Sequence, residues 1–363
     1  MDKNKLYQQA LLLAPLTTDE GVFLFKNAPL NELMIVANEL RQRHVPGNGV
    51  SWQIDRNVNI TNICISGCTF CNFHCKLHEQ SKSYTTTLKE YVQKIEGLFK
   101  YGGDQLLLQG GLHPRYGLAF YKDLFRQLKQ RYPQLKLHAL GPPEVAHIAR
   151  LEKLSYREVL DELVSSGLDS LPGAGAEILC DRVRKRLSPG KPNAQVWSDV
   201  MREAHKMNLA TSATMVFGHI ETLEERMQHL VKIRELQDEK PNGHYGFLAF
   251  ICWPMRLKGT KLEEQVQPKL VSMQEYVRMV AISRIMLNNV TNIQASWLTV
   301  GKDTAQLCLH AGANDMGSIM IEENVVSSAG AEHSFNAEGI QKAIIEAGYT
   351  PWLRDQKYQP RDL

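Results

Sequence analysis

Four of the seven cysteines in this 363-residue chain lie within twelve residues, at Cys64, Cys68, Cys71 and Cys75. An odd number of cysteines is a poor basis for a disulfide framework, and clustered thiols in a reducing compartment favour a metal centre. Cys64, Cys68 and Cys71 are spaced by four and three residues. Their thiolates could therefore ligate one face of an iron–sulfur cube and leave the fourth iron free, whereas a structural cluster or zinc site would normally use four protein ligands.

An open iron predicts a particular chemistry. It could chelate the amino and carboxylate groups of S-adenosylmethionine, and electron transfer to the sulfonium would release a 5′-deoxyadenosyl radical. Phe70 would shield such a [4Fe–4S] cluster from water, and Gly67 would allow the tight loop. The alternative is a zinc site completed by Cys75 or His74, which the spacing alone leaves open. The position directly after an expected strand favours the cluster.

Strand-like and helix-like segments alternate from residue 56 onward. The clearest helical stripe has apolar residues at 88, 91, 92, 95, 98 and 99. Eight expected strands alternating with helices predict an α/β fold, a parallel (β/α)₈ barrel of the TIM type. Asp315 and Gly317 are poor strand residues, so the eighth strand is the least clearly marked. The expected strands span residues 56–63, 105–109, 136–140, 168–172, 211–217, 245–251, 293–299 and 314–320.

We expect one continuous domain, because no repeat, low-complexity tract or linker interrupts the sequence. Residues 1–50 form an N-terminal helical extension, residues 51–320 the barrel core, and residues 321–363 a C-terminal closing segment with one helix near 336–347. Polar and glycine-rich stretches follow the expected strands, at the end of a parallel barrel where active sites are built. These stretches include residues 64–71, 109–114, 141–144, 172–177 and 218–221.

Composition argues against several classes of partner. A formal net charge of +3 is too small to indicate nucleic acid. The longest apolar runs are strand-sized and the first residues lack the pattern of a signal peptide, so we expect a cytoplasmic protein that does not span a membrane. A short basic run at residues 182–186 could hold an anionic group, although a solvated helix face is the favoured interpretation.

The cysteine motif, Cys-x₃-Cys-x-aromatic-Cys, resembles in full that of the radical S-adenosylmethionine superfamily. The resemblance implies a [4Fe–4S] cluster on the three cysteines of this motif, with S-adenosylmethionine bound to it. It also implies that Gln109, Gly110 and Gly111 receive the amino group of the cofactor. The superfamily's usual acidic residue after the glycines is Leu112 here, so that contact would come from the backbone.

Longer stretches resemble the futalosine branch of menaquinone biosynthesis, over roughly residues 35–350. Residues 294–297 and 314–326 look like the cyclic dehypoxanthine futalosine synthase family and less like its sister, aminofutalosine synthase. Two departures from the family pattern are Gly141, where serine is usual, and Ala174, which replaces the middle glycine of a loop. Both replacements are small residues, so we expect altered loop packing and no loss of function.

This resemblance implies cyclisation of dehypoxanthine futalosine. The adenosyl radical would take the hydrogen from C4′ of the substrate ribose, and the carbon radical would add to the substrate's own aromatic ring, which then loses a proton and an electron. The protein would position both groups and exclude water. It would also need an external electron donor such as flavodoxin or ferredoxin. The alternatives are aminofutalosine synthase and a non-catalytic iron–sulfur or zinc-binding protein.

Four acidic and imidazole side chains are candidates for cofactor binding or proton transfer, each with a structural alternative. Glu144 and Glu177 would bind the cofactor ribose or a substrate hydroxyl, or else brace their loops. His219 and Glu221 would face the barrel mouth if the register is as expected, and a binding role is the favoured interpretation for them. One of the two would also be the base that restores aromaticity to the ring.

Four further residues are candidate substrate contacts. His113 would contact a substrate carboxylate, or else shape the turn before Pro114. Trp297 would stack on an aromatic substrate, although filling of the barrel interior is the favoured interpretation. Glu322 and Glu323 would hold ribose hydroxyls, or else cap the closing segment.

Overall fold

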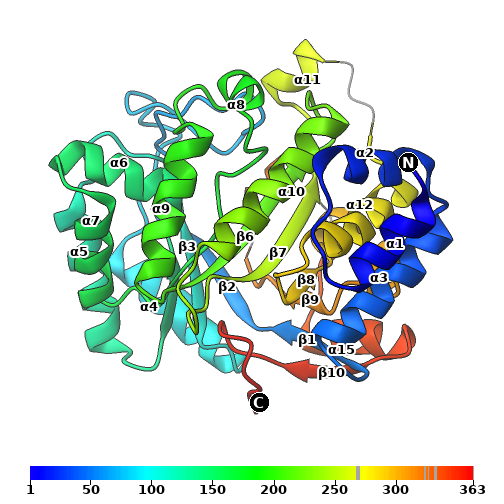
Figure 1. The fold of residues 1–363 in the computed structure, drawn as a ribbon. Helices are drawn as coiled ribbons and strands as arrows, with labels where there is room; N and C mark the ends of the chain where they lie inside the picture. The colour runs from blue at the N-terminus through cyan, green and yellow to red at the C-terminus, as the bar shows by residue number, and fades with distance from the viewer. Residues whose placement is uncertain (267–269, 323, 326, 331–332, 363) are drawn as a thin grey trace.

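The computed structural model describes residues 1–266, 270–322, 324–325, 327–330 and 333–362. In this part of the chain the strands form a ten-stranded sheet in the order β10-β1-β9-β8-β7-β6-β5-β4-β3-β2 (Figure 1). Every neighbouring pair of strands runs parallel. The strands are β1 (Gly49–Gln53), β2 (Asp55–Asn59), β3 (Gln105–Gln109), β4 (Lys136–Ala139), β5 (Ser170–Leu171), β6 (Ala210–Phe217), β7 (Phe247–Pro254), β8 (Asn292–Gln294), β9 (Asp315–Ser318) and β10 (Thr350–Leu353).

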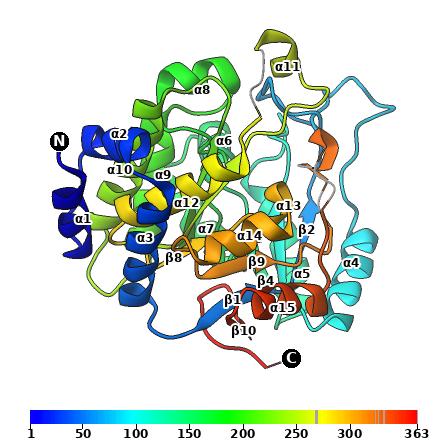
Figure 2. The same cartoon turned by 90° about the vertical axis from the view of Figure 1, so that its right-hand side faces the viewer.

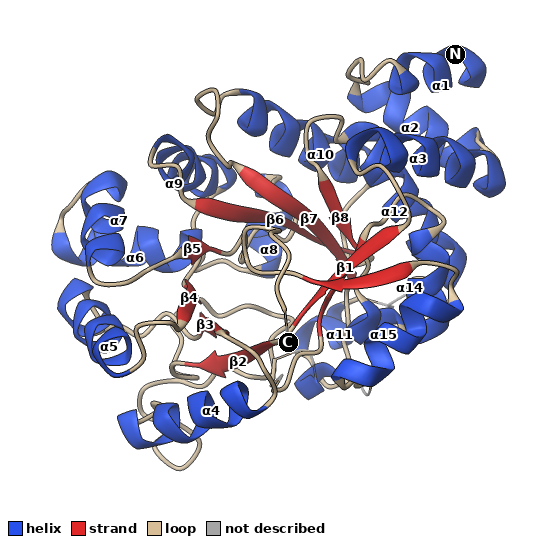
Figure 3. Cartoon of the chain, turned by 90° about the horizontal axis from the view of Figure 1, so that it is seen from below, coloured by secondary structure: helices blue, strands red, loops and turns tan. Residues whose placement is uncertain are grey.

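The sheet curls into a barrel, because β1 and β2 are separated by Ile54 alone. β1 pairs with β9 and β2 pairs with β3, so one segment joins the two sides of the ring. Backbone bonds continue the join: the Ile319 N–H donates to Gln53 O at 3.0 Å, and the Ile321 N–H donates to Asp55 O at 3.3 Å. Figure 3 shows the ring from below. The predicted TIM-type barrel is confirmed, with β2 to β9 at the eight expected places.

Most of the helices lie outside the ring of strands (Figure 3). In α4 (Leu88–Lys100), Thr87 forms a capping box with Glu90, and Tyr91, Ile95 and Leu98 bury one face of the helix. Burial of such an apolar stripe fixes a helix against a sheet. The other helices are α1 (Lys3–Leu11), α2 (Thr18–Asn27), α3 (Leu30–His44), α5 (Leu118–Arg131), α6 (Pro142–Glu152), α7 (Tyr156–Ser165), α8 (Asp181–Leu187), α9 (Ala194–Lys206), α10 (Leu223–Asp238), α11 (Lys261–Gln265), α12 (Met273–Met286), α13 (Trp297–Val300), α14 (Lys302–Leu309) and α15 (Ala337–Glu346).

The first three helices pack on the outside of the barrel, where α2 and α3 contact α10 and α12 (Figure 2). The Arg278 guanidinium on α12 donates to Ala28 O at 2.7 Å, which ties the end of α2 to the barrel helices. These helices lie within the segment predicted to be a helical extension. No helix among the described residues is long and apolar enough to cross a bilayer.

Two strands, β1 and β10, were not expected from the sequence. They pair with each other from Gly49 to Trp52 and from Thr350 to Leu353. The Asn48 amide also donates to Gly348 O at 2.8 Å, 300 residues further along the chain. A strand whose partner is this distant has no local pattern that reports the pairing, because the stabilising contacts are all non-local.

The C-terminal segment after β10 closes the lower end of the barrel. In Figure 3 the C-terminus lies over the centre of the ring. Arg354, Gln356 and Tyr358 line the barrel cavity from this segment. Arg354 forms an ion pair with Asp315 on β9 at 2.5 Å, which anchors the segment to the barrel.

The expected strand at 293–299 is wrong in its second half. β8 ends at Gln294, and Trp297 begins the short helix α13. The backbone turns at this point because the Trp297 N–H donates to Ala295 O at 3.1 Å. The indole N–H of Trp297 donates to Ser318 O at 3.1 Å, which fixes the ring against β9.

One other strand boundary also differs from expectation. β2 ends at Asn59, four residues before the end of the expected strand 56–63, because Thr61 and Asn62 bond residues of a following loop. Between β5 and β6 the chain forms two helices, α8 and α9. Two prolines, Pro189 and Pro192, lie between them, and proline interrupts the helical hydrogen bonds.

Candidate active site

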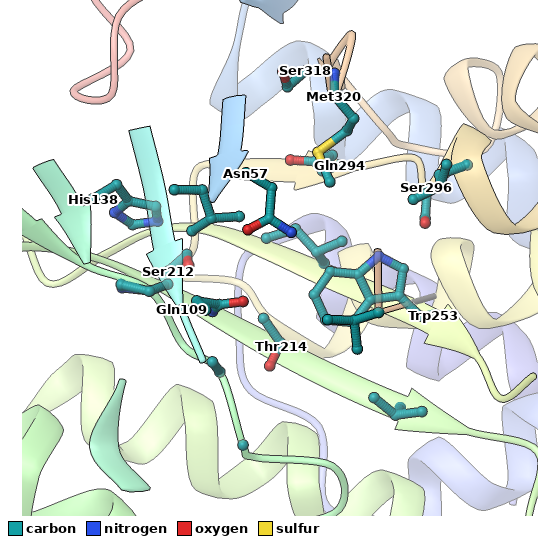
Figure 4. Close-up of a pocket in the computed structure, with 18 of the residues that line it drawn as sticks. Asn57, Gln109, His138, Ser212, Thr214, Trp253, Gln294, Ser296, Ser318 and Met320 are labelled. Carbon is teal, nitrogen blue, oxygen red and sulfur yellow. Dashed lines mark hydrogen bonds between the residues drawn. The ribbon is translucent and has the colours of Figure 1, made fainter. Parts of the chain in front are cut away.

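A cavity of about 440 Å³ occupies the barrel interior, from the loops that follow the strands down to the C-terminal segment. Figure 4 shows side chains from β2, β3, β4, β6, β7, β8 and β9 around this space. The lining includes Cys64, Cys68 and Cys71. The cavity therefore connects the cysteine loop with the interior of the barrel.

Two facing walls of the cavity differ in character. The polar wall comes from β2, β3 and β4 and carries Asn57, Asn59, Gln105, Gln109 and His138. The apolar wall comes from β7 and α13 and carries Ile251, Trp253, Trp297 and Leu298. Asn57, Gln109, His138 and Trp253 are labelled in Figure 4. Such a cavity suits a ligand with hydroxyl groups on one side and an aromatic ring on the other.

Backbone bonds to two other loops hold the cysteine loop over the cavity. The Ile65 N–H donates to Leu112 O at 3.1 Å, and the Gly190 N–H donates to Ser66 O at 2.9 Å. The Thr69 N–H donates to Leu187 O at 2.8 Å. The loop between α8 and α9 thus supports the cysteines, although nothing in the cysteine motif itself indicates this contact.

Donors surround the Cys64 sulfur. The Leu112 N–H donates to Cys64 Sγ at 3.2 Å, and the Ser66 hydroxyl lies 2.9 Å from the same atom. Burial raises the pKa of the Cys64 thiol, and the Ser66 and Leu112 donors act against this by favouring the thiolate. Hydrogen bonds to a ligating sulfur also stabilise a bound metal centre.

Cys75 differs from the other three clustered cysteines. Its thiol is buried and donates to Asn62 Oδ1 at 3.3 Å, and it does not line the cavity. His74 does line the cavity, and its Nδ1 lies 2.8 Å from Cys71 O. Among the described residues, no three histidine, cysteine or acidic side chains are arranged to hold a single metal ion. Three thiols that face one cavity are a donor set that fits a larger iron–sulfur cluster.

The glycine pair after β3 lies directly against the cysteine loop. A Cβ on Gly111 would lie 2.2 Å from Ile63 O and 2.8 Å from Cys64 Cβ, so only glycine fits there. Gln109, Gly110 and Gly111 all line the cavity, as does Phe70. The residues that the family resemblance assigns to cofactor binding are therefore brought together beside the cysteines.

A buried charge cluster lies on the same side of the cavity. The Lys191 ammonium donates to Glu177 Oε1 at 2.6 Å, and Arg184 lies 3.4 Å from Glu177 Oε2. Burial acts to raise the pKa of the Glu177 carboxyl, but the charges of Lys191 and Arg184 outweigh it and hold that pKa below its usual range. The Lys191 ammonium also lies 5.7 Å from the centre of the Phe70 ring. Glu177 is thus an anion with two cationic partners.

Glu144 has a different environment, although it also lines the cavity. It lies in the first turn of α6 and is 7% exposed. Burial raises the pKa of its carboxyl to about 7, against smaller opposing contributions from backbone N–H groups and Lys191. A carboxyl with this pKa can both donate and accept a hydrogen bond near neutral pH.

His219 and Glu221, the expected proton-transfer pair, do not line the cavity. Their side chains are fully buried within the loop after β6, with His219 Nδ1 2.8 Å from Glu221 Oε2. Glu221 also accepts from the Gly218 N–H at 2.6 Å and from Arg226 at 2.7 Å. Burial acts to raise the pKa of the Glu221 carboxyl, but His219 and Arg226 outweigh this effect and hold that pKa well below its usual range. These contacts brace the loop.

Three of the four expected substrate contacts lie among the described residues, and one of these three lines the cavity. His113 is buried outside the cavity lining, where its ring stacks on Tyr116 at 3.6 Å. Glu322 also lies outside the cavity lining and pairs with Arg56 at 3.0 Å and with Lys94 at 2.5 Å. Trp297 lines the cavity, and Glu323 lies outside the described residues.

The sequence analysis did not assign Lys191 or Arg184 to the site. Lys191 lies in the Ser-Pro-Gly-Lys-Pro-Asn segment, which reads only as a turn. Arg184 belongs to the basic run that was interpreted as a solvated face, yet it is 2% exposed and binds Glu177. Arg182, two residues earlier, is exposed as expected for a solvated face and pairs with Glu225. The spacing of the charges does not show that Arg184 is buried while Arg182 is exposed.

The chain matches two family models. Residues 58–233 match the model described as the radical SAM superfamily, and residues 244–363 match the model described as the CofH/MqnC C-terminal region. Together these matches run from within β2 to residue 363, apart from residues 234–243, which span the end of α10 and part of the loop before β7. Residues that line the cavity lie in both matched ranges.

This chain is similar to two curated relatives in sequence and to one solved structure in fold. A cyclic dehypoxanthine futalosine synthase from Streptomyces coelicolor is 39% identical over 99% of this chain and 88% of the relative. A 5-amino-6-(D-ribitylamino)uracil–L-tyrosine 4-hydroxyphenyl transferase from Methanosarcina barkeri is 37% identical over 94% of this chain and 88% of the relative. The crystal structure of methylornithine synthase (PylB) superposes with a TM-score of 0.72 at 17% identity, over 97% of this chain and 98% of that one, which shows a shared fold.

Proposed function

Because this chain belongs to the radical S-adenosylmethionine superfamily, in the branch that contains the cyclic dehypoxanthine futalosine synthases, we propose that it cyclises dehypoxanthine futalosine. C4′ of the substrate ribose would be joined to the substrate's own aromatic ring, with net loss of two hydrogens. The observation that carries this proposal is the convergence of Cys64, Cys68 and Cys71 on a cavity with one polar and one aromatic wall.

The three cysteines would hold a [4Fe–4S] cluster. With S-adenosylmethionine bound, such a cluster supplies a 5′-deoxyadenosyl radical that removes the C4′ hydrogen. The Leu112 N–H and the Ser66 hydroxyl would stabilise the Cys64 thiolate, because each lies within hydrogen-bond distance of its sulfur.

Five cavity residues would hold the cofactor beside the cysteines. Gly110 and Gly111 bring the backbone close to the cysteine loop, so a ligand's amino group could reach carbonyl oxygens there. Lys191 would neutralise a carboxylate, with Glu177 keeping its ammonium in place. Glu144 would accept hydrogen bonds from ribose hydroxyls, since its carboxyl lines the cavity.

The two walls would orient the substrate. Asn57 and Gln109 on the polar wall offer both donors and acceptors to the ribose hydroxyls. Trp253 and Trp297 on the apolar wall offer flat apolar surfaces to the aromatic ring. Holding both ends of one molecule in this way would keep C4′ close to the ring carbon that it must attack, and would keep water away from a carbon radical.

The reaction would also need a source of electrons, and an external donor such as flavodoxin or ferredoxin would reduce the cluster. The reaction would take place in the cytoplasm. Residues 1–50, 51–320 and 321–363 would act as helical extension, catalytic barrel and closing segment of one domain. The ion pair between Arg354 and Asp315 supports this last point, because it joins the closing segment to the barrel.

The test is anaerobic reconstitution of the full-length protein with iron and sulfide, followed by reaction with S-adenosylmethionine, a reductant and dehypoxanthine futalosine. We expect 5′-deoxyadenosine and a product two hydrogens lighter than the substrate. With substrate deuterated at C4′, the deuterium should be found in 5′-deoxyadenosine. These two products together require both hydrogen removal at C4′ and ring closure.

Other outcomes would contradict the proposal in different ways. An adduct that contains the adenosyl group, formed from an enolpyruvyl benzoate, would identify aminofutalosine synthase chemistry. Formation of a tyrosine-derived adduct with a ribitylaminouracil would identify the reaction named for the transferase relatives. No 5′-deoxyadenosine with any of these substrates would indicate a protein that binds a cluster without this chemistry.

A further inference from the structure

Three cationic side chains of lysine or arginine line the cavity among the described residues: Lys191, Arg256 and Arg354. The Lys191 ammonium pairs with Glu177 at 2.6 Å. Arg354 is neutralised by Asp315, which contacts both Nε and Nη2 of the guanidinium. Each of these two cations therefore already has a carboxylate partner within the protein.

Arg256 has no carboxylate partner among the residues that the structure describes. Its Nη2 donates to Thr299 O, which is a neutral carbonyl. Its Nε is buried and has no hydrogen-bond partner in the described part of the chain. A buried guanidinium donor without a partner is costly, and native proteins normally pair such groups with protein, water or ligand. Nη1 makes no hydrogen bond in the described part of the chain, so Nη1 and the second hydrogen of Nη2 remain for a ligand in the cavity that Arg256 lines.

The position of Arg256 indicates which part of a ligand would lie there. It follows β7 by two residues, so it lies at the cavity end of the strand that carries Trp253. Its contact with Thr299 attaches the guanidinium to α13, the helix that begins at Trp297. The guanidinium thus lies at the edge of the apolar wall, where an aromatic ring would have its polar substituent.

We propose that Arg256 binds the carboxylate of an aromatic acid whose ring lies against the apolar wall. This inference rests on the proposed function, because it assigns a contact to the end of the substrate that carries the aromatic ring. A guanidinium pairs with a carboxylate through two parallel hydrogen bonds, which fix direction as well as distance. Arg256 is then a specificity-determining residue: it sets the end of the molecule opposite to the ribose.

Binding without turnover tests this assignment independently of the reaction. The probes are 3-acetylbenzoate and its neutral counterpart 3-acetylbenzamide, added to the cluster-reconstituted full-length protein without reductant and followed by ligand-observed NMR. We expect the wild type to bind the acid roughly 10- to 100-fold more tightly than the amide, the range for a hydrogen bond to a charged group. In Arg256→Met this preference should fall to about twofold or less, because the carboxylate loses its cation.

Two further variants separate charge from structure. Arg256→Lys keeps the charge and loses the planar pair of donors, so it should retain part of the preference for the acid. Lys258→Met removes one positive charge from the same loop at an exposed position, and should leave the preference unchanged. If Arg256→Met proves unstable, the Arg256→Lys variant still decides, because an unchanged acid preference in that variant would contradict bidentate binding.

Turnover of dehypoxanthine futalosine provides the second measurement. Arg256→Met should raise KM roughly 10- to 100-fold, with a much smaller change in kcat, because Arg256 would contact a ring substituent and take no part in hydrogen removal at C4′. A wild-type protein that prefers 3-acetylbenzoate but does not turn over the substrate would overturn the proposed function and leave the Arg256 site standing. A wild type without acid preference, or an Arg256→Met variant that keeps it, would overturn the Arg256 assignment alone.

Discussion

The cofactor side and the apolar wall of the cavity are built in opposite ways. On the cofactor side, polar and charged groups already have partners within the protein: Glu177 pairs with Lys191 and Arg184, and the Cys64 sulfur accepts from the Leu112 N–H and contacts the Ser66 hydroxyl. The apolar wall offers ring surfaces, and its one neighbouring cation, Arg256, has no described carboxylate partner.

This difference indicates where the protein is organised before a ligand arrives. Closely packed, paired groups hold their geometry without a ligand, which suits a reaction that must direct a radical at one carbon atom. Among the described residues, the apolar wall presents ring surfaces and the unpaired cation of Arg256, so its geometry would be completed by the substrate. Variants on the cofactor side should therefore stop the chemistry, whereas variants on the apolar wall should weaken substrate binding.

The largest expected effect is at the cysteines. Cys68→Ala should remove most of the iron and bring 5′-deoxyadenosine formation below detection, because three thiolates are the expected protein ligands. Cys75→Ala is the matched control, since Cys75 is equally near in sequence but bonds Asn62 outside the cavity. Iron content and 5′-deoxyadenosine are measured after anaerobic reconstitution. Loss of iron from Cys75→Ala would show that the ligand set is different.

Gly111→Ala should have the next largest effect. The added Cβ would lie 2.2 Å from the backbone oxygen of Ile63, which cannot move without shifting the cysteine loop. We expect a loss of about 1–3 kcal/mol in stability together with a lower iron content. Gly97→Ala is the control, because its nearest neighbour is the end of the flexible Arg56 side chain. Equal iron content in the two variants would contradict a role for Gly111 beside the cluster.

Lys191→Met should alter the pH dependence of the reaction. Lys191 helps to hold the pKa of the Glu177 carboxyl below its usual range, so its removal should raise that pKa. Below the raised pKa the carboxyl would be protonated, and the acid limb of kcat/KM should therefore move to higher pH. Lys185→Met removes a charge from the exposed face of α8 and is the control. An unshifted acid limb in Lys191→Met would show that Glu177 does not need its charge.

Glu221→Gln should act mainly on stability. The pKa of Glu221 is held well below its ordinary value of 4.5, so its ionised form stabilises the fold above that value, and this contribution is lost as the pH falls towards the folded pKa. We expect a loss of about 1–3 kcal/mol at pH 7. The difference from wild type should shrink below about pH 4 in thermal unfolding. Full stability with no product formation would instead support the sequence-based hypothesis that this residue is the base.

The barrel was predictable because its evidence is local. Alternating strands and amphipathic helices occur at spacings that any window of the sequence reveals, and β2 to β9 form where that pattern indicates. β1 and β10 were missed because their pairing joins segments 300 residues apart. The sequence pattern predicted a strand at Trp297, but this residue begins α13. Its indole position depends on a hydrogen bond to Ser318 on another strand, which the local sequence does not report.

The candidate site was likewise predictable only in part. A short motif identified the cysteines, and the loops after β3, β4 and β5 supplied Gly110, Glu144 and Glu177, all of which line the cavity. The same reasoning selected His219 and Glu221, which follow β6 but turn inward to bond their own loop. The position of a polar residue after a barrel strand does not indicate whether its side chain points to the cavity or forms hydrogen bonds with the backbone of its own loop.

By itself, the sequence determined the eight-membered ring of strands, the clustered cysteines and the family to which the chain belongs, because repeated local patterns and one dense motif report these features. The tertiary structure alone decided which charges meet. It brought Lys191 and Arg184 to Glu177, buried the Cys75 thiol against Asn62 outside the cavity lining, and left Arg256 without a described carboxylate partner beside an aromatic wall. Electrostatic pairing depends on distances between segments that are remote in sequence, and those distances exist only in the folded chain.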